Sequence, residues 1–134
     1  MKDWKSLSHV RWDCKYHLVF ISKYRHRTIY GELRKKIGGI IRDLCGQKGI
    51  EVHEGHAMPD HIHLLLSVPP KFSISNTVGF IKGKSAIRIH RELLVTKRMT
   101  GLRFWATGYC VSTVGLDEET IKKYIREQSD PDKK

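Results

Sequence analysis

The stretch IEVHEGHAMPDHIHLLLSV, residues 50–68, decides the fold of this chain. Its two halves, residues 50–57 and 61–68, are rich in residues that favour extended backbone, and each has the length of an ordinary strand. Between them, Pro59 fixes its own φ angle and the Asp60 carboxylate can cap a turn. The stretch therefore predicts two antiparallel strands joined by a tight turn.

The segments on either side of this hairpin complete a mixed fold. Residues 14–21 alternate in the manner of a strand, and apolar residues recur at helical spacing from Leu33 to Leu44. We expect a second helix from Ser73 to about Leu94, a strand over residues 103–114, and a short helix over about 117–129. This order predicts an α+β fold of the split β-α-β type, ferredoxin-like or RRM-like. Its antiparallel sheet has helices on one face, and a C-terminal helix follows.

Composition excludes several classes of protein. A length of 134 residues with 40% hydrophobic residues suits one domain over residues 1–134 and excludes a disordered chain. No apolar run approaches the roughly 20 residues that cross a bilayer, and the N-terminus lacks a signal-peptide core. We therefore expect a soluble, cytoplasmic protein without a membrane partner. The three cysteines are far apart in sequence, which disfavours a disulfide framework.

The charge balance indicates a polyanionic partner. The chain has 25 Lys and Arg residues against 14 Asp and Glu residues, a formal net charge of +11. Nucleic acid is the first partner to consider for such a surplus, and solubility alone is the alternative. The basic residues gather in the segment 22–28 and along the second predicted helix. The candidates for contacts with phosphates are Arg25, Arg27, Lys82, Lys84 and Arg88.

His61 and His63 are the strongest local signal for chemistry. Residues two apart in a strand point the same way, so both imidazoles leave one face while Ile62 enters the core. Two imidazoles on a rigid strand begin a site for a metal ion, such as Mn or Mg with oxygen ligands or a later transition metal. The pattern alone leaves a second interpretation open, because two histidines on a solvated face also occur by chance.

The last predicted helix offers two further candidates. Tyr124 and Gln128 are four residues apart and share a helical face. A tyrosine hydroxyl can act as a nucleophile, and an amide oxygen of Gln128 could be a third metal ligand. The alternative is that Tyr124 packs with Ile121 and Ile125 while Gln128 is solvated.

Several sequence blocks together resemble one known family, the small single-tyrosine HUH transposases of bacterial and archaeal insertion sequences, the insertion-sequence-two-hundred-like group. The resemblance spans roughly residues 16–128 and keeps the order and spacing of all the blocks. The main departure is a short tail after Gln128. The blocks are YHLVF at 16–20, MPDHIHLL at 58–65, IKGKS at 81–85, FWATGY at 104–109, VSTVG at 111–115 and IKKYIREQ at 121–128.

The resemblance implies roles for four residues. It implies that His61 and His63 are the HUH metal ligands, that Gln128 is the third ligand, and that Tyr124 is the nucleophile. The metal would be Mg or Mn. It also implies a homodimer in which the histidines of one subunit combine with the tyrosine helix of the other.

The resemblance further implies a DNA transposase that acts at the prokaryotic nucleoid. Such an enzyme cleaves and rejoins single-stranded, hairpin-bearing ends of its element through a 5′-phosphotyrosine, without ATP. Two other functions stay open at this point. One is a non-enzymatic single-strand-binding or RNA-binding module of ferredoxin-like fold, which needs neither metal nor Tyr124. The other is an HUH replication initiator, which nicks origins by similar chemistry. Palindromic sequences flanking the gene would favour the transposase.

Overall fold

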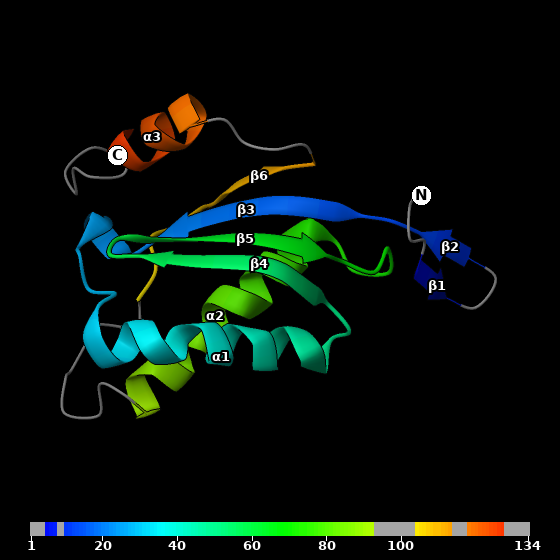
Figure 1. The fold of residues 1–134 in the computed structure, drawn as a ribbon, viewed down its shortest axis with the longest axis horizontal. Helices are drawn as coiled ribbons and strands as arrows, with labels where there is room; N and C mark the ends of the chain where they lie inside the picture. The colour runs from blue at the N-terminus through cyan, green and yellow to red at the C-terminus, as the bar shows by residue number, and fades with distance from the viewer. Residues whose placement is uncertain (1–4, 8–9, 93–103, 114–117, 128–134) are drawn as a thin grey trace.

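A four-stranded antiparallel sheet in the order β4-β5-β3-β6 forms the centre of the molecule (Figure 1). The computed structural model describes residues 5–7, 10–92, 104–113 and 118–127. Helices α1 and α2 lie against one face of the sheet and α3 lies over the other, so the predicted α+β class is confirmed. The elements are β1 (Lys5–Leu7), β2 (Val10–Trp12), β3 (Lys15–Ile21), η1 (Lys23–Arg25), α1 (Gly31–Gln47), β4 (Glu51–Met58), β5 (His61–Ser67), α2 (Ile74–Glu92), β6 (Cys110–Ser112) and α3 (Glu118–Glu127).

The hairpin β4–β5 forms as the sequence predicts. Its turn lies at Pro59 and Asp60, and Met58 pairs with His61 directly across it. Along β5, Ile62 and the apolar residues that alternate with it are buried against the helices. Their neighbours in sequence therefore project from the opposite face, which α3 covers.

The main core lies between the sheet and the two long helices. Leu18 and Phe20 of β3 pack there with Ile37 of α1 and Ile81 of α2, and all four side chains are fully buried. Burial of each such side chain contributes about 1.5–3 kcal/mol to folding. Burial also raises the pKa of the Cys45 thiol to about 11, against a smaller opposing effect of the nearby Arg42 charge. Cys45 is therefore a small core residue.

The predicted strand over residues 103–114 is wrong in its extent. In the described part of this segment, only Cys110–Ser112 joins the sheet, while Trp105 makes one isolated bridge with the residue that follows β3. The ladder is interrupted because Gly108 has a φ angle of +92°. In addition, the Lys82 ammonium group donates hydrogen bonds to the carbonyl oxygens of Ala106 and Gly108, both at 2.7 Å. In a continuous strand these carbonyl oxygens would accept hydrogen bonds from the neighbouring strand, but here they accept them from the Lys82 side chain of α2.

Lys82 is expected to contribute to stability through these two bonds. Replacing it with Met keeps the apolar stem and removes the ammonium group, so Lys82→Met should lower the free energy of unfolding by about 2 kcal/mol. Urea denaturation measures the change. Lys84→Met is the matched control, since Lys84 is exposed on the same helix and should change stability by less than about 0.5 kcal/mol. Equal effects of the two substitutions would contradict this role.

One hairpin is absent from the sequence prediction, and one predicted helix end is untested. The short hairpin of β1 and β2, which pairs Lys5 with Trp12, is not predicted by the sequence pattern. The second helix is described as far as Glu92, and its predicted end at Leu94 lies outside the described residues. Within the part of the chain that the structure describes, no helix is long and apolar enough to span a membrane.

Candidate active site on the histidine face

Four histidines share the sheet face that α3 covers, which we call the histidine face. The register pairs Val19 of β3 with Cys110 on one side and with His63 on the other, and His63 pairs with His56. Directly paired residues project from the same face of a sheet, so the side chains of Cys110, Val19, His63 and His56 form one row across all four strands. The histidines of this face are His17, His56, His61 and His63.

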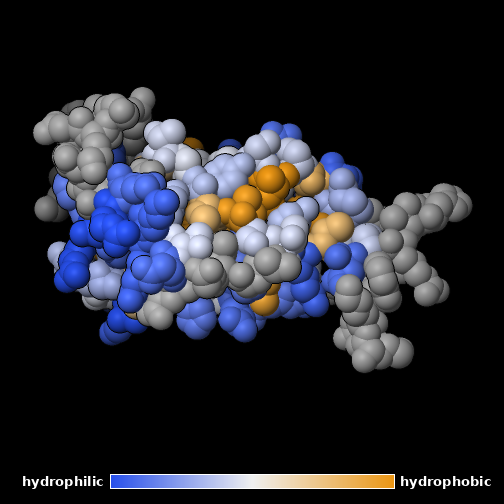
Figure 2. Space-filling model, turned by 90° about the horizontal axis from the view of Figure 1, so that it is seen from above, coloured by the Kyte–Doolittle hydropathy of each residue, from blue (hydrophilic) through white to orange (hydrophobic). Residues whose placement is uncertain are grey.

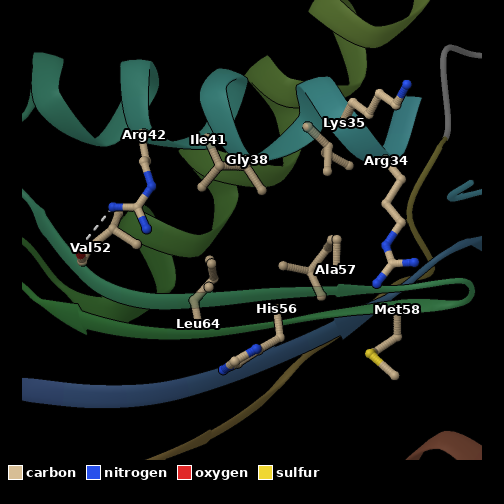
Figure 3. Close-up of a pocket in the computed structure, with 13 residues that line it drawn as sticks. Arg34, Lys35, Gly38, Ile41, Arg42, Val52, His56, Ala57, Met58 and Leu64 are labelled. Atoms are coloured by element: carbon tan, nitrogen blue, oxygen red, sulfur yellow. Dashed lines mark hydrogen bonds between the residues drawn. The ribbon is translucent and has the colours of Figure 1, made fainter. Parts of the chain in front are cut away.

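The pictures show the two faces of the sheet directly. In Figure 3, Ala57 and Leu64 point toward α1, whereas His56 and Met58 point away from it. Figure 2 looks onto the α3 side, where a band of apolar surface lies beside strongly hydrophilic surface at the end that carries α3. The histidine face is therefore only partly covered by α3 and is accessible to a ligand.

His61 is held in one orientation by the turn that precedes it. Its Nδ1 lies 2.8 Å from Oδ1 of Asp60, and Oδ2 of Asp60 lies 3.8 Å from Nε of Arg25. An Nδ1–H that donates to a carboxylate leaves the lone pair on Nε2 free. Metal-binding histidines commonly have this arrangement, with a carboxylate fixing the tautomer. The environment of His61 thus suits a metal ligand.

His63 lies among the other imidazoles. Its Nε2 is 3.4 Å from Nδ1 of His17, and its ring centroid is 6.2 Å from that of His56. Burial lowers the pKa of His63, and the nearby charge of His17 is the next largest cause. Glu54 opposes this effect more weakly. His63 is therefore neutral at neutral pH, which is the state that binds metal.

Tyr124 projects from α3 toward the sheet and is half-buried. Its hydroxyl is buried, and it has no hydrogen-bond partner within the described residues. Burial raises the pKa of Tyr124 to about 12, with a further contribution from the nearby Cys110 thiol. The phenol is thus protonated at neutral pH, and its oxygen is available to a group that enters the site.

The structure brings Tyr124, His61 and His63 to the same face but at different strands. Tyr124 lies near Cys110 of the edge strand β6, whereas the two histidines are on β5, with β3 between. Two strand spacings amount to about 10 Å. Gln128 lies outside the described residues. Within the described ranges, no group of three or more His, Cys, Asp or Glu side chains is arranged to hold a metal ion. A site on His61 and His63 would thus need a further ligand of another kind, such as an amide oxygen.

The predicted phosphate-binding residues fall into two groups. Arg25 and Arg27 lie in the loop beside the Pro59–Asp60 turn, which it contacts through backbone hydrogen bonds. The three on α2 lie behind the sheet, on the side away from the histidine face. Among these, Lys82 bonds to backbone carbonyls, Lys84 is exposed, and Arg88 pairs with Glu92 and Asp43.

Two residues of this face have roles that the sequence analysis did not assign. Asp60 orients His61, and its position directly before the histidine pair was the only available signal. His17 approaches His63 from β3, and its position in an alternating segment was compatible with this face. Sequence alone could not place β3 beside β5.

A cavity of about 350 Å³ lies between α1 and β4 (Figure 3). Apolar side chains including Ile41 and Leu64 line the cavity, and Arg34 and Arg42 from α1 are also part of its lining. The Arg42 guanidinium donates a hydrogen bond to the Val52 carbonyl at 3.1 Å. Most of the lining belongs to the helix side of the sheet, and His56 and Met58 from the strand β4 also contribute to it.

Comparison with known proteins shows the family of this chain. The family model described as "Transposase IS200 like" matches residues 10–128. The chain belongs to this IS200-like transposase family. It is 44% identical over 134 residues to the transposase for insertion sequence element IS200 of Salmonella typhimurium, covering 99% of this chain and 88% of the relative. It is 39% identical over 118 residues to the ISDra2 transposase TnpA of Deinococcus radiodurans, covering 87% and 84%.

Solved structures show the same fold. A crystal structure from Deinococcus radiodurans R1, of a protein assigned as a transposase, superposes with a TM-score of 0.80 at 34% identity. It covers 97% of this chain and 99% of that one. The REP-associated tyrosine transposase bound to a REP hairpin gives a TM-score of 0.56 at 10% identity, covering 95% and 70%. This second likeness concerns the fold alone. The IS200-like family therefore places the chain among DNA transposases.

Proposed function

We propose that this transposase cleaves and rejoins single-stranded DNA at the ends of its insertion sequence, with Tyr124 as the nucleophile. One observation carries the proposal: the buried hydroxyl of Tyr124, which has no hydrogen-bond partner among the described residues, faces the same side of the sheet as His61, whose Nδ1 contacts Asp60. The family membership supports it, because transposition requires cutting and joining of DNA strands.

The reaction exchanges one phosphate ester for another. The Tyr124 oxygen attacks a backbone phosphorus and forms an O–P bond, while the bond from phosphorus to the 3′-oxygen breaks. The phenol loses its proton to solvent or a base, and the departing 3′-oxygen gains one. Attack of a 3′-hydroxyl on the resulting 5′-phosphotyrosine then restores the phosphodiester and the tyrosine. Each step conserves the number of ester bonds, so no ATP is needed.

The residues of the histidine face fit a divalent metal ion, Mg²⁺ or Mn²⁺. His61, His63 and Gln128 would hold the ion, which when bound polarises the phosphate and stabilises negative charge. Asp60 keeps the His61 ring in place through its Nδ1–H, and Arg25 holds the Asp60 carboxylate. The low pKa of His63 keeps a lone pair available.

The covalent intermediate gives the test of this function. Full-length protein is incubated with a single-stranded oligonucleotide of the element's end plus Mn²⁺, and adducts that resist denaturation are counted on gels and by mass spectrometry. We expect a protein–DNA adduct on the peptide that contains Tyr124. Excess EDTA should remove it. Undiminished cleavage in EDTA would overturn the role of the metal, and cleavage without any adduct would overturn the role of tyrosine.

Single-stranded DNA with hairpin ends is the proposed partner. The net charge of +11 supports a nucleic-acid ligand, and the related fold of the REP-associated transposase holds a REP hairpin. Arg25 and Arg27 lie next to the turn that holds His61, and this position supports a contact with the strand near the reacting phosphate. Lys84 and Arg88 would contact DNA that passes behind the sheet.

Binding should depend steeply on salt. With about six phosphate contacts, the slope of log K against log salt concentration is expected on the order of −4 for a single strand. Arg27→Ala should lower affinity for all sequences and reduce this slope by roughly 0.7, because one contact is lost. Fluorescence anisotropy at several salt concentrations measures both. A slope near zero would point to a partner other than nucleic acid.

We further propose a homodimer whose active sites combine histidines and tyrosine from different subunits. Within one chain, Tyr124 lies near β6 while the two histidines are on β5, with β3 between them. This separation supports the proposal, because α3 could bring Tyr124 closer to the histidines of a second subunit by docking on that subunit's sheet. Gly108, which has a positive φ angle, lies two residues before β6 on the way to this helix.

Complementation between two inactive proteins tests the shared site. We expect that mixing His61→Ala/His63→Ala protein with Tyr124→Phe protein restores up to half of the cleavage per dimer. One composite site of the mixed dimer then has intact histidines and an intact tyrosine. Native mass spectrometry of the mixture confirms subunit exchange. Exchange without recovered cleavage would show that each tyrosine serves the histidines of its own chain.

A further inference from the structure

The loop that follows β3 combines an exposed tyrosine with cationic side chains. Its residues 23–27 read Lys-Tyr-Arg-His-Arg, and η1 occupies the first three of them. Tyr24 is 39% exposed. The Lys23 ammonium group lies 5.4 Å from the centroid of the Tyr24 ring, and the His26 ring stands edge-on to that ring at 5.7 Å between centroids. The loop therefore presents an aromatic ring beside positive charge.

The backbone of this loop is held in a conformation that residues with a side chain rarely adopt. Tyr24 and Arg25 have φ angles of +58° and +57°. Such residues cost free energy and persist where surrounding contacts fix the backbone. The Lys23 N–H donates to the Phe104 carbonyl at 2.9 Å, and the Arg25 N–H donates to the Ser22 carbonyl at 2.8 Å. The strained pair is thus held in place by hydrogen bonds before any ligand binds.

The same loop is attached to the turn that precedes His61. Figure 1 shows it at the end of the sheet where β4 and β5 are joined. The Ser22 N–H donates to the Asp60 carbonyl at 3.0 Å, and Nε of Arg25 lies 3.8 Å from the Asp60 carboxylate. That carboxylate in turn contacts Nδ1 of His61. A ligand bound on this loop therefore lies next to the proposed active site.

We propose that Tyr24 stacks on an unpaired base of single-stranded DNA, next to the phosphate that Tyr124 attacks. Every base has a flat π face, so a tyrosine ring binds it without reading its edges, and neighbouring cations contact the backbone. Lys23 supplies one such cation, and Arg25 has further N–H donors besides the one that faces Asp60. The stacking surface stands on the loop itself, whereas its place beside the reacting phosphate rests on the proposed cleavage function.

DNA affinity without added metal tests the stacking independently of cleavage. Fluorescence anisotropy with full-length protein and a single-stranded oligonucleotide of the element's end should show that Tyr24→Leu weakens binding roughly 5- to 100-fold, because the ring is lost. Tyr24→Phe keeps the ring and should stay within about threefold of wild type. The matched control is Tyr30→Leu, which should also stay within about threefold. Tyr30 is 68% exposed but lies at the start of α1, outside this loop.

Three results of the affinity measurement would overturn the stacking. They are equal losses in Tyr24→Leu and Tyr30→Leu, an unchanged affinity in Tyr24→Leu, and the absence of binding by the wild-type protein.

A glycine variant separates binding from folding. Glycine adopts a positive φ angle without steric cost, so Tyr24→Gly should leave the thermal midpoint of unfolding unchanged or raise it. It should nevertheless lose DNA affinity as Tyr24→Leu does. A large fall of the midpoint in both variants would assign Tyr24 a structural role and overturn the stacking.

Oligonucleotides with a single abasic position locate the stacked base. In wild type, the abasic position next to the cleaved bond should weaken binding roughly 5- to 100-fold, and in Tyr24→Leu the same lesion should cost less than about threefold. This pattern at a distant base would contradict the placement beside the reacting phosphate. If no protein forms an adduct under any condition, the cleavage function and this placement fail, while the affinity measurements still decide whether Tyr24 stacks on DNA.

Photocrosslinking of the wild-type protein keeps the proposal testable if the variants do not fold. An oligonucleotide with 5-iodouracil beside the cleaved bond should crosslink on irradiation to the peptide that contains Tyr24, as identified by mass spectrometry. Crosslinking to other peptides alone would contradict the proposal.

Discussion

Tyr124→Phe is expected to abolish the covalent protein–DNA adduct and leave the fold intact. The substitution removes only the hydroxyl oxygen that would attack phosphorus, and the ring keeps its packing. Because that hydroxyl is buried and has no hydrogen-bond partner in the described part of the chain, its removal should leave the free energy of unfolding unchanged or raise it by about 1 kcal/mol. Gel assays for the adduct and urea denaturation measure the two effects, and DNA affinity should stay within a few-fold of wild type.

The pH dependence of the wild-type reaction offers a second check on the same residue. Since the pKa of Tyr124 is raised to about 12, the phenolate is a small fraction at neutral pH and grows about tenfold per pH unit up to that value. Single-turnover adduct formation should therefore rise with pH between about 7 and 9. An adduct formed by the Phe variant at the wild-type rate would remove Tyr124 from the mechanism.

His61→Ala is expected to eliminate cleavage with little effect on folding. The imidazole lies on the histidine face and outside the main core, so its loss leaves no large cavity among the buried apolar side chains. Asp60→Asn should give a smaller loss of cleavage. The amide oxygen can still accept a hydrogen bond from Nδ1–H of His61, but it lacks the negative charge of the carboxylate and orients the ring less firmly. We expect Mn²⁺ affinity and cleavage rate to fall about 10- to 100-fold. Calorimetry and the adduct assay measure these two quantities.

A carboxylate elsewhere on the same face serves as the control for Asp60. Glu54 is on the neighbouring strand β4, where its side chain is 64% exposed and makes a 3.6 Å contact with His56. Glu54→Gln should leave Mn²⁺ affinity within about threefold of wild type, since His61 keeps its partner. If Asp60→Asn and Glu54→Gln have the same effect, general surface charge rather than orientation of His61 explains the loss.

The positions of the main candidates could be predicted because they depend on local periodicity. A strand has a repeat of two residues, so His61 and His63 had to share a face wherever the strand lay in the sheet. Pro59 and Asp60 likewise predicted a turn from their own backbone and side-chain preferences. The structure confirms both.

The predicted strand over residues 103–114 shows where such local reasoning ends. Its residues favour extended backbone, yet the carbonyls of Ala106 and Gly108 bond to Lys82 from a helix more than twenty residues earlier. No local pattern reveals that a lysine which looks like a phosphate ligand has an ammonium group directed at the backbone. The described sheet pairing of this segment is confined to Cys110–Ser112 and the Trp105 bridge for that reason.

The sequence by itself thus determined the two long helices, the β4–β5 hairpin, the common face of the two strand histidines and, through its resemblance, the transposase family. The order of strands was decided by tertiary packing, because it depends on which apolar faces can be buried together across the whole chain. That order puts His17 3.4 Å from His63 and Tyr124 near Cys110. The separation between the proposed nucleophile and the histidines follows from the same long-range register, which residue periodicity does not encode.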